Sequence, residues 1–193
     1  MYKEYMESYR ASLFPAIESL DPEQFGKMID IFVNAYKNDK TIFIMGNGGS
    51  AGTANHFVCD FNKNAVVDPA KRRFRVISVS DNVEKITALG NDIAFDEIFR
   101  QQLINLMRPE DVLISVSASG SSPDLVKACE YAKELGGHII TLSGFSGGKT
   151  KAYAEASLVA PLTSYEQIED IHLMILHMIV YFFKQHQELL EEK

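Results

Sequence analysis

The feature that most constrains this chain is an alternation of short apolar runs with segments long enough to hold helices. The runs are rich in valine and isoleucine, and they are TIFIM (41–45), RVISV (75–79), DVLISV (111–116), HIITL (138–142) and a weaker SLVAP (157–161). Strands that alternate with helices form parallel sheets covered by helices on both faces. The sequence therefore predicts an α/β fold, with a three-layer, doubly wound parallel sheet of about five strands.

Helices are expected at both ends of the chain. Before the first strand, residues such as Leu13 and Ile17 follow a helical period, and Asp21-Pro22 marks the start of a second helix. A long final helix is expected from about Ser164 to near the C-terminus. It contains more apolar residues than one buried face needs, which predicts burial against another subunit.

Composition restricts the function classes. The chain has 193 residues, 46% of them hydrophobic, which suffices for one domain with a real core. A net charge of −7 excludes a broadly basic nucleic-acid binder. The opening residues are too charged for a secretory signal, and the most apolar run, 171–183, is too short for a membrane span. We therefore expect a cytoplasmic protein with no membrane or nucleic-acid partner.

A glycine-rich first loop, GNGGS (46–50), follows the first predicted strand and opens a helix. Glycines allow close approach of the backbone to a ligand, and a helix N-terminus offers unpaired N–H donors to an anion. The loop formally fits a dinucleotide-binding fingerprint, but the acidic residue expected about 20 positions later is missing, because Asp81 comes too late. An anion-binding loop and a ligand-free turn both fit this pattern.

A serine-rich second loop, SASGSS (117–122), follows the third predicted strand. Ser122 is suited to cap the next helix, with Pro123 as its first residue. The loop holds more serines than a cap requires, and hydroxyl and amide donors suit phosphate oxygens. Ligands of open α/β sheets bind at the carboxyl ends of the strands, so the two loops predict one site for a phosphorylated sugar.

With these motifs, the chain resembles the sugar isomerase (SIS) domain proteins and, among them, the phosphoheptose isomerases. The resemblance runs in order through GNGGSAGTANHF, ALGND, SASGSS, LSGFSGGK and IEDIHLMILH. It implies a single SIS domain over 1–193, with a flavodoxin-like α/β core over 41–193 and a helical oligomerisation segment over 1–40. It also implies a homotetramer with active sites at subunit interfaces, which converts sedoheptulose 7-phosphate into D-glycero-D-manno-heptose 7-phosphate.

The resemblance also assigns site residues position by position. The substrate-binding residues it implies are Asn47, Gly48, Gly49, Ser50, Asn91, Asp92, Ser117, Ala118, Ser119, Ser122 and Glu169. One zinc ion per site is implied at His56, Asp60, Glu169 and His177, the last three of which are also the implied catalytic residues. The family usually has Glu at the Asp60 position and Gln at the Glu169 position, so two residues depart from its pattern.

The side chains themselves fit this chemistry. His56 and Asp60 are four positions apart, on one helix face, and both are ordinary zinc ligands. Aldose–ketose isomerisation needs a base at carbon and an acid at the carbonyl oxygen, for which Asp60 and His177 are the natural pair.

The spacing of the last two residues raises a different expectation. Glu169 and His177 are eight positions apart on one helix, so we expect one of them to reach the metal from a neighbouring chain. The alternative function is a non-catalytic SIS protein, which binds a phosphosugar as a regulator or serves as a scaffold for a protein partner.

Overall fold

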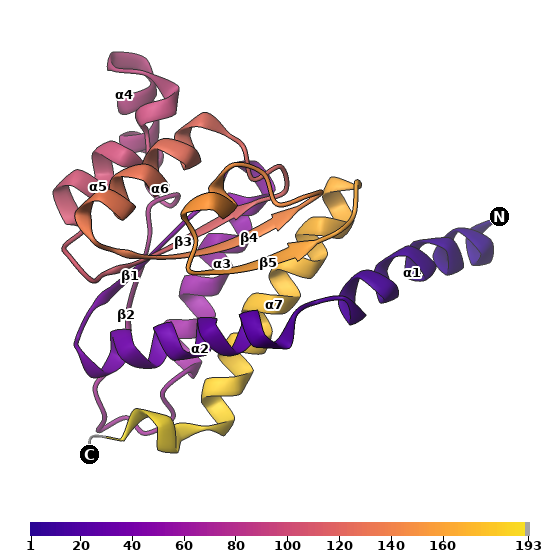
Figure 1. The fold of residues 1–193 in the computed structure, drawn as a ribbon, viewed down its shortest axis with the longest axis horizontal. Coiled ribbons are helices and arrows are strands. Elements are labelled where there is room, and N and C mark those ends of the chain that lie inside the picture. The colour runs from indigo at the N-terminus through magenta and orange to yellow at the C-terminus, as the bar shows by residue number, and fades with distance from the viewer. Residues whose placement is uncertain (192–193) are drawn as a thin grey trace.

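The structure, a computed structural model, describes residues 1–191 and has a three-layer α/β architecture (Figure 1). Its five parallel strands are β1 (Thr41–Met45), β2 (Arg75–Ser78), β3 (Val112–Ser117), β4 (His138–Gly144) and β5 (Ala156–Ala160). Their order in the sheet, β2-β1-β3-β4-β5, confirms the predicted doubly wound, flavodoxin-like fold. The direction of winding reverses between β1 and β3, so the two loops that follow these strands are neighbours.

Helices cover both faces of the sheet. On one face, α2 (Pro22–Lys37), α3 (Gly48–Asn64) and α7 (Tyr165–Gln185) enclose a core that includes Phe32, Phe57 and Phe183. On the other face, α5 (Arg100–Leu106) and α6 (Pro123–Leu135) contribute Leu103 and Leu125 to a second core. The central strand β3 is buried at every position, including Ser115 and Ser117, as expected of a parallel strand covered on both faces.

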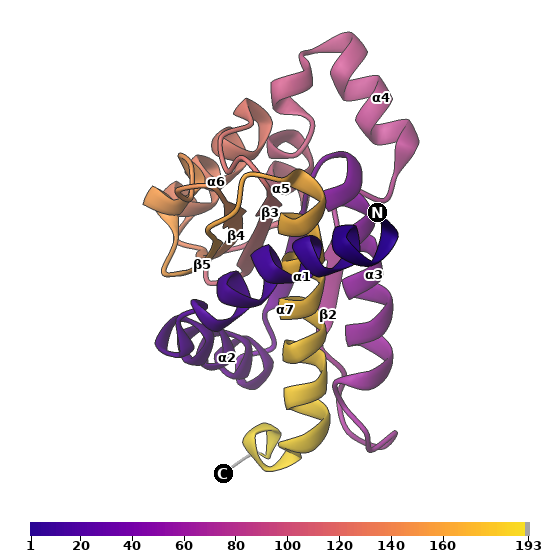
Figure 2. The ribbon, with the colours of Figure 1, turned by 90° about the vertical axis from the view of Figure 1, so that its right-hand side faces the viewer.

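Two helices project from this body (Figures 1 and 2). α1 (Tyr2–Glu18) extends away from the sheet and leaves Tyr2, Tyr5 and Phe14 more than half exposed. α4 (Val83–Asp92) has no buried residue. Short 3₁₀ turns over Phe95–Glu97, Thr150–Tyr153 and Gln187–Leu190 complete the described chain.

The predicted helix starts are found where side chains cap them. Asp21 accepts a hydrogen bond from the Glu23 N–H at 2.8 Å, and α2 begins at Pro22 as predicted. Ser164 caps α7, which begins at the next residue. Within residues 1–191, no helix combines the length and apolar character that crossing a membrane requires.

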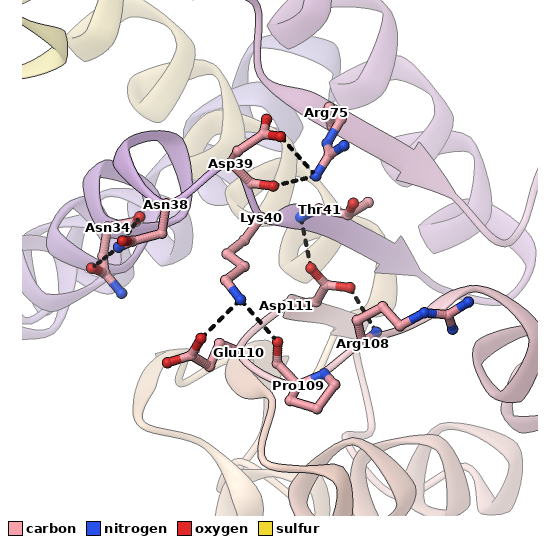
Figure 3. A network of polar contacts seen from close by, with 10 residues as sticks. All are labelled: Asn34, Asn38, Asp39, Lys40, Thr41, Arg75, Arg108, Pro109, Glu110 and Asp111. Atoms are coloured by element: carbon pink, nitrogen blue, oxygen red, sulfur yellow. Dashed lines mark hydrogen bonds and ion pairs between the residues drawn. The ribbon is translucent and has the colours of Figure 1, made fainter. Parts of the chain in front are cut away.

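Polar contacts hold the amino ends of the strands together (Figure 3). The buried Asp111 carboxylate accepts hydrogen bonds from the Thr41 N–H at 2.8 Å and the Arg108 N–H at 2.7 Å. Beside it, the Arg75 guanidinium contacts both the carbonyl and the carboxylate of Asp39. These contacts fix the register of β1, β2 and β3 at the end of the sheet opposite to the two loops.

Candidate functional site

The first loop is a tight turn at the carboxyl end of β1. Met45 pairs with Ser115 of β3, which brings the first loop beside the second. A Cβ added to Gly46 would lie 2.7 Å from the Ser50 carbonyl oxygen, and Gly48 has a φ of +52°. Gly46 leaves no space for a side chain, and the backbone conformation of Gly48 is one that other residues rarely adopt, so both positions favour glycine. The Ser80 hydroxyl secures the turn by donating to the Gly46 carbonyl at 2.8 Å.

Hydrogen bonds between its main chain and its own serine hydroxyl groups stabilise the second loop. Ser117 Oγ accepts a hydrogen bond from the Gly120 N–H at 3.1 Å, and Ser119 Oγ accepts one from the Ser121 N–H at 3.2 Å. Ala118 between them is buried, and its carbonyl accepts a hydrogen bond from the Gly144 N–H. These contacts give the loop a fixed shape without any ligand.

The turn after β4 braces the second loop from outside. The Gly120 carbonyl accepts hydrogen bonds from the Thr150 N–H at 2.9 Å and from Thr150 Oγ1 at 3.2 Å. Gly120 has a φ of +58°, and a Cβ there would collide with the Gly147 carbonyl oxygen. The LSGFSGGK motif therefore supports the second loop, a role that its sequence did not reveal.

The helices that begin at the two loops lack side-chain caps. Asp21, Asn82 and Ser164 use their side chains to cap α2, α4 and α7. Asn47 and Ser122 hold the same N-cap position at α3 and α6, but neither makes a side-chain cap bond. Ser122 is thus the N-cap residue, as predicted, but its hydroxyl does not cap the helix. Uncapped N–H groups and two helix dipoles suit the binding of an anion between the loops.

Three of the predicted metal ligands converge where α3 meets α7. His56 Nε2 lies 3.2 Å from Asp60 Oδ2 and 2.9 Å from His177 Nε2. The distance between Asp60 Oδ2 and His177 Nε2 is 3.6 Å. We call this set the His–Asp–His group. Its three ligand atoms lie within 4.8 Å of one another, and all three residues belong to one chain. Two imidazole nitrogens and a carboxylate oxygen are a donor set that fits zinc and leaves a coordination position open.

Glu169, the fourth predicted ligand, lies against the first loop. A Cβ added to Gly49 would collide with both of its carboxylate oxygens. Glu169 is outside the His–Asp–His group of the described chain. The eight-residue separation along α7 thus directs the Glu169 carboxylate to the first loop, whereas the His177 imidazole reaches His56 and Asp60 within the same chain.

Three further residues of interest lie apart from the His–Asp–His group. Asn91 and Asp92 end α4, where both are exposed and the Asn91 amide donates to the Asp92 carboxylate at 2.8 Å. This pair remains a prediction. His172, between Glu169 and His177 in sequence, faces the core, and burial lowers its pKa to about 4.

A buried carboxylate that the sequence analysis did not single out connects the two loops. Asp124, in the first turn of α6, is 1% exposed, and its Oδ2 accepts a hydrogen bond from Asn47 Nδ2 at 2.6 Å. Burial raises the pKa of Asp124 above its ordinary value, against the opposing effect of the Asn47 hydrogen bond. The two residues are 77 positions apart, so no local pattern could have paired them.

Comparisons with known proteins find relatives over most of the chain. The SIS domain family matches residues 4–144. A phosphoheptose isomerase of Helicobacter pylori strain P12 is 32% identical over 184 residues, which are 95% of this chain and 94% of the relative. A phosphoheptose isomerase of Citrifermentans bemidjiense is 35% identical over 176 residues, 91% of this chain and 86% of the relative. The solved phosphoheptose isomerase of Neisseria gonorrhoeae has a TM-score of 0.86 at 27% identity, and the match covers 96% of this chain and 100% of that one.

Proposed function

Because the chain belongs to the SIS domain family and, within it, to the phosphoheptose isomerases, we propose that it converts sedoheptulose 7-phosphate into D-glycero-D-manno-heptose 7-phosphate. It is an isomerase of heptose biosynthesis. The observation that carries a catalytic role is the His–Asp–His group, because a protein that only binds a sugar phosphate has no need for three adjacent titratable side chains.

The two loops divide the substrate between them. The phosphate binds at the second loop, where N–H and hydroxyl donors match its oxygens, through Ser117, Ala118, Ser119 and Ser122. The sugar extends over the first loop, where glycine allows close approach, past Asn47, Gly48, Gly49 and Ser50. Asn91 and Asp92, at the end of the projecting α4, complete the site across a subunit interface.

The reaction moves a proton between adjacent carbons through an enediol. Asp60 acts as the base at carbon, and His177 acts as the acid at the carbonyl oxygen. Glu169 adds a second carboxylate beside Gly49, on the side where the sugar lies, and is available to the same proton transfer. Because Asp is one methylene shorter than the family's usual Glu, this second carboxylate offsets the shorter reach of Asp60.

The His–Asp–His group is the proposed zinc site. Its three donor atoms suit the ion. The side chains are accessible, because His56 is 49% exposed, Asp60 31% and His177 46%. When bound, zinc would polarise the substrate carbonyl and stabilise developing negative charge. Glu169 stays a predicted fourth ligand, and the position of its carboxylate against the first loop supports a contact with the sugar as well.

Exposed apolar side chains support the proposed homotetramer. Tyr2, Tyr5 and Phe14 on α1, and Met178 and Tyr181 on α7, are between 44% and 78% exposed. Their burial against other copies of the chain would remove a large apolar surface from water. Light scattering should give four chain masses. A phosphorylated sugar substrate fits the cytoplasmic location expected from the sequence.

Turnover of purified protein on sedoheptulose 7-phosphate, followed by NMR, tests the function. We expect aldoheptose 7-phosphate to form, to stop forming after chelation and to form again when zinc is added. His177→Ala should abolish turnover while the fold and phosphate binding are retained, because it removes the acid and one zinc donor but leaves both loops unchanged. Substrate binding without turnover in the zinc-loaded protein would contradict the isomerase and favour a phosphosugar-binding regulator or scaffold.

A further inference from the structure

Asp124 is a buried charge without a cation beside it. Its side chain is 1% exposed, and no ion pair involves it within residues 1–191. Burying a carboxylate without a cation is unfavourable. Hydrogen bonds from the Asn47 amide and from the main-chain N–H groups of Asp124 and Leu125 offset that cost only in part, since burial still keeps the pKa of Asp124 above its ordinary value. A residue that costs stability in this way commonly has a role in function.

The partner of Asp124 is also in an unusual arrangement. Asn47 holds the N-cap position of α3, where an Asn side chain normally accepts a hydrogen bond from the helix. Asn82 does so at α4, where its Oδ1 accepts from the Lys85 N–H at 2.8 Å. Asn47 instead directs its amide nitrogen to Asp124 Oδ2 at 2.6 Å. The helix therefore loses a stabilising cap in favour of a contact between the two loops.

This contact determines which atom of Asn47 is left for a ligand. An ionised carboxylate can only accept hydrogen bonds, so Asn47 must present its NH₂ group to Asp124. The carbonyl oxygen Oδ1 of Asn47 then remains an acceptor, and no hydrogen bond to it is formed within the described residues 1–191. Asn47 is half-buried at the first loop, so the group that fits this acceptor is the hydroxyl of a bound sugar.

We propose that Asp124 is a positioning residue, which holds the Asn47 amide so that its Oδ1 accepts a hydrogen bond from a hydroxyl group of the phosphosugar. In naming the ligand, this proposal rests on the isomerase function given above. Asp124 follows Ser122 and Pro123 at the start of α6. Its contact with Asn47 therefore also fixes the distance between the first loop and the second loop.

Asp124→Asn separates a positioning role from a structural one. The new amide has the same size but can both donate and accept, so Asn47 is no longer held in one orientation. We expect kcat/KM to fall about tenfold, mainly through a higher KM. The melting temperature should change little, because the removal of a buried charge offsets the weaker hydrogen bonds from the main-chain N–H groups of Asp124 and Leu125. A fall in melting temperature with unchanged kcat/KM would overturn the proposal.

Asp111→Asn is the matched control. Asp111 is equally buried, at 3% exposure, but it lies at the amino end of the strands and accepts hydrogen bonds from two main-chain N–H groups. An amide cannot accept both in the same geometry, so one buried donor loses its partner. We expect the opposite result from Asp124→Asn: a lower melting temperature and unchanged kcat/KM.

A double-mutant cycle tests whether Asp124 acts through Asn47. If it does, Asp124→Asn should cause little further loss of kcat/KM in an Asn47→Ala background. Additive losses would mean that Asp124 acts on the substrate by another route and would overturn the proposal.

The NMR signals of the Asn47 side-chain amide give a readout that needs no turnover. In the wild-type protein we expect these protons to exchange slowly with water, because they donate to a buried carboxylate, and Asp124→Asn should shift the signals. Unchanged signals would overturn the proposal. If the wild-type protein does not isomerise sedoheptulose 7-phosphate, the proposed function fails, whereas the Asn47 signals still decide whether Asp124 holds this side chain.

Discussion

Replacement of Gly46 by alanine should disturb both stability and catalysis. The added Cβ would lie 2.7 Å from the Ser50 carbonyl oxygen and 2.8 Å from the Ser50 carbonyl carbon and Cβ, whereas ordinary contacts begin at 3.4 Å. The first loop must therefore move by about 0.7 Å, the difference between 3.4 and 2.7 Å. Overpacking of this kind costs about 1–3 kcal/mol, and a misplacement near 1 Å can reduce catalysis about a hundredfold.

Gly26→Ala is the matched control for this change. Gly26 lies within α2, and a Cβ there would meet nothing within 4 Å. Alanine in a helix interior is more stable than glycine by about 0.5–1 kcal/mol, so this variant should melt at a slightly higher temperature.

Calorimetry and the heptose phosphate assay on both variants test the reasoning. Gly46→Ala should melt lower by about 2–4 °C for each kcal/mol lost and have a kcat/KM at least tenfold below that of the wild type, whereas Gly26→Ala keeps its activity. Wild-type stability and kinetics in Gly46→Ala would refute the assignment of the first loop as a tight, substrate-facing turn.

Two further predictions concern single side chains. Ser119→Ala should raise KM more than it lowers kcat, because it removes a phosphate donor from the second loop, and steady-state kinetics would show the split. Burial lowers the pKa of His172 from its ordinary value of 6.5 to about 4 in the folded protein. The unfolded chain therefore takes up a proton first, and stability should fall as the pH drops from 6.5 towards 4. Urea denaturation should show a shallower fall in His172→Leu over this range, and equal pH dependence in the two proteins would contradict the neutral, buried ring.

The fold could be predicted because its signals are local. A fully buried parallel strand such as β3 must be a short apolar run, and a capped helix such as α7 must begin just after a residue like Ser164. Helical geometry likewise indicates that Glu169 and His177, eight positions apart, lie about two turns apart on α7. These properties depend on residues close together in the chain, which makes them readable from sequence.

Contacts between distant segments were beyond such reasoning. His56 and His177 are 121 positions apart, and only the family resemblance, not their local sequence, predicted that they share a site. The spacing of Glu169 and His177 predicted that one of them reaches the metal from a neighbouring subunit. His177 lies in the same chain as His56 and Asp60, and a ligand from another subunit stays a prediction. Ser122 was correctly placed as an N-cap, but its unused hydroxyl depends on a side-chain rotamer that sequence does not specify.

The position of His177 in the last long helix also affects how the protein is made. The first loop follows β1, the first strand to leave the ribosome, whereas α7 emerges after all five strands. A nascent chain therefore lacks the third member of the His–Asp–His group, and a helix that encloses the core on one face of the sheet, until α7 has been made. A chain released before α7 would lack both this histidine and the apolar side chains that α7 packs against Phe32 and Phe57.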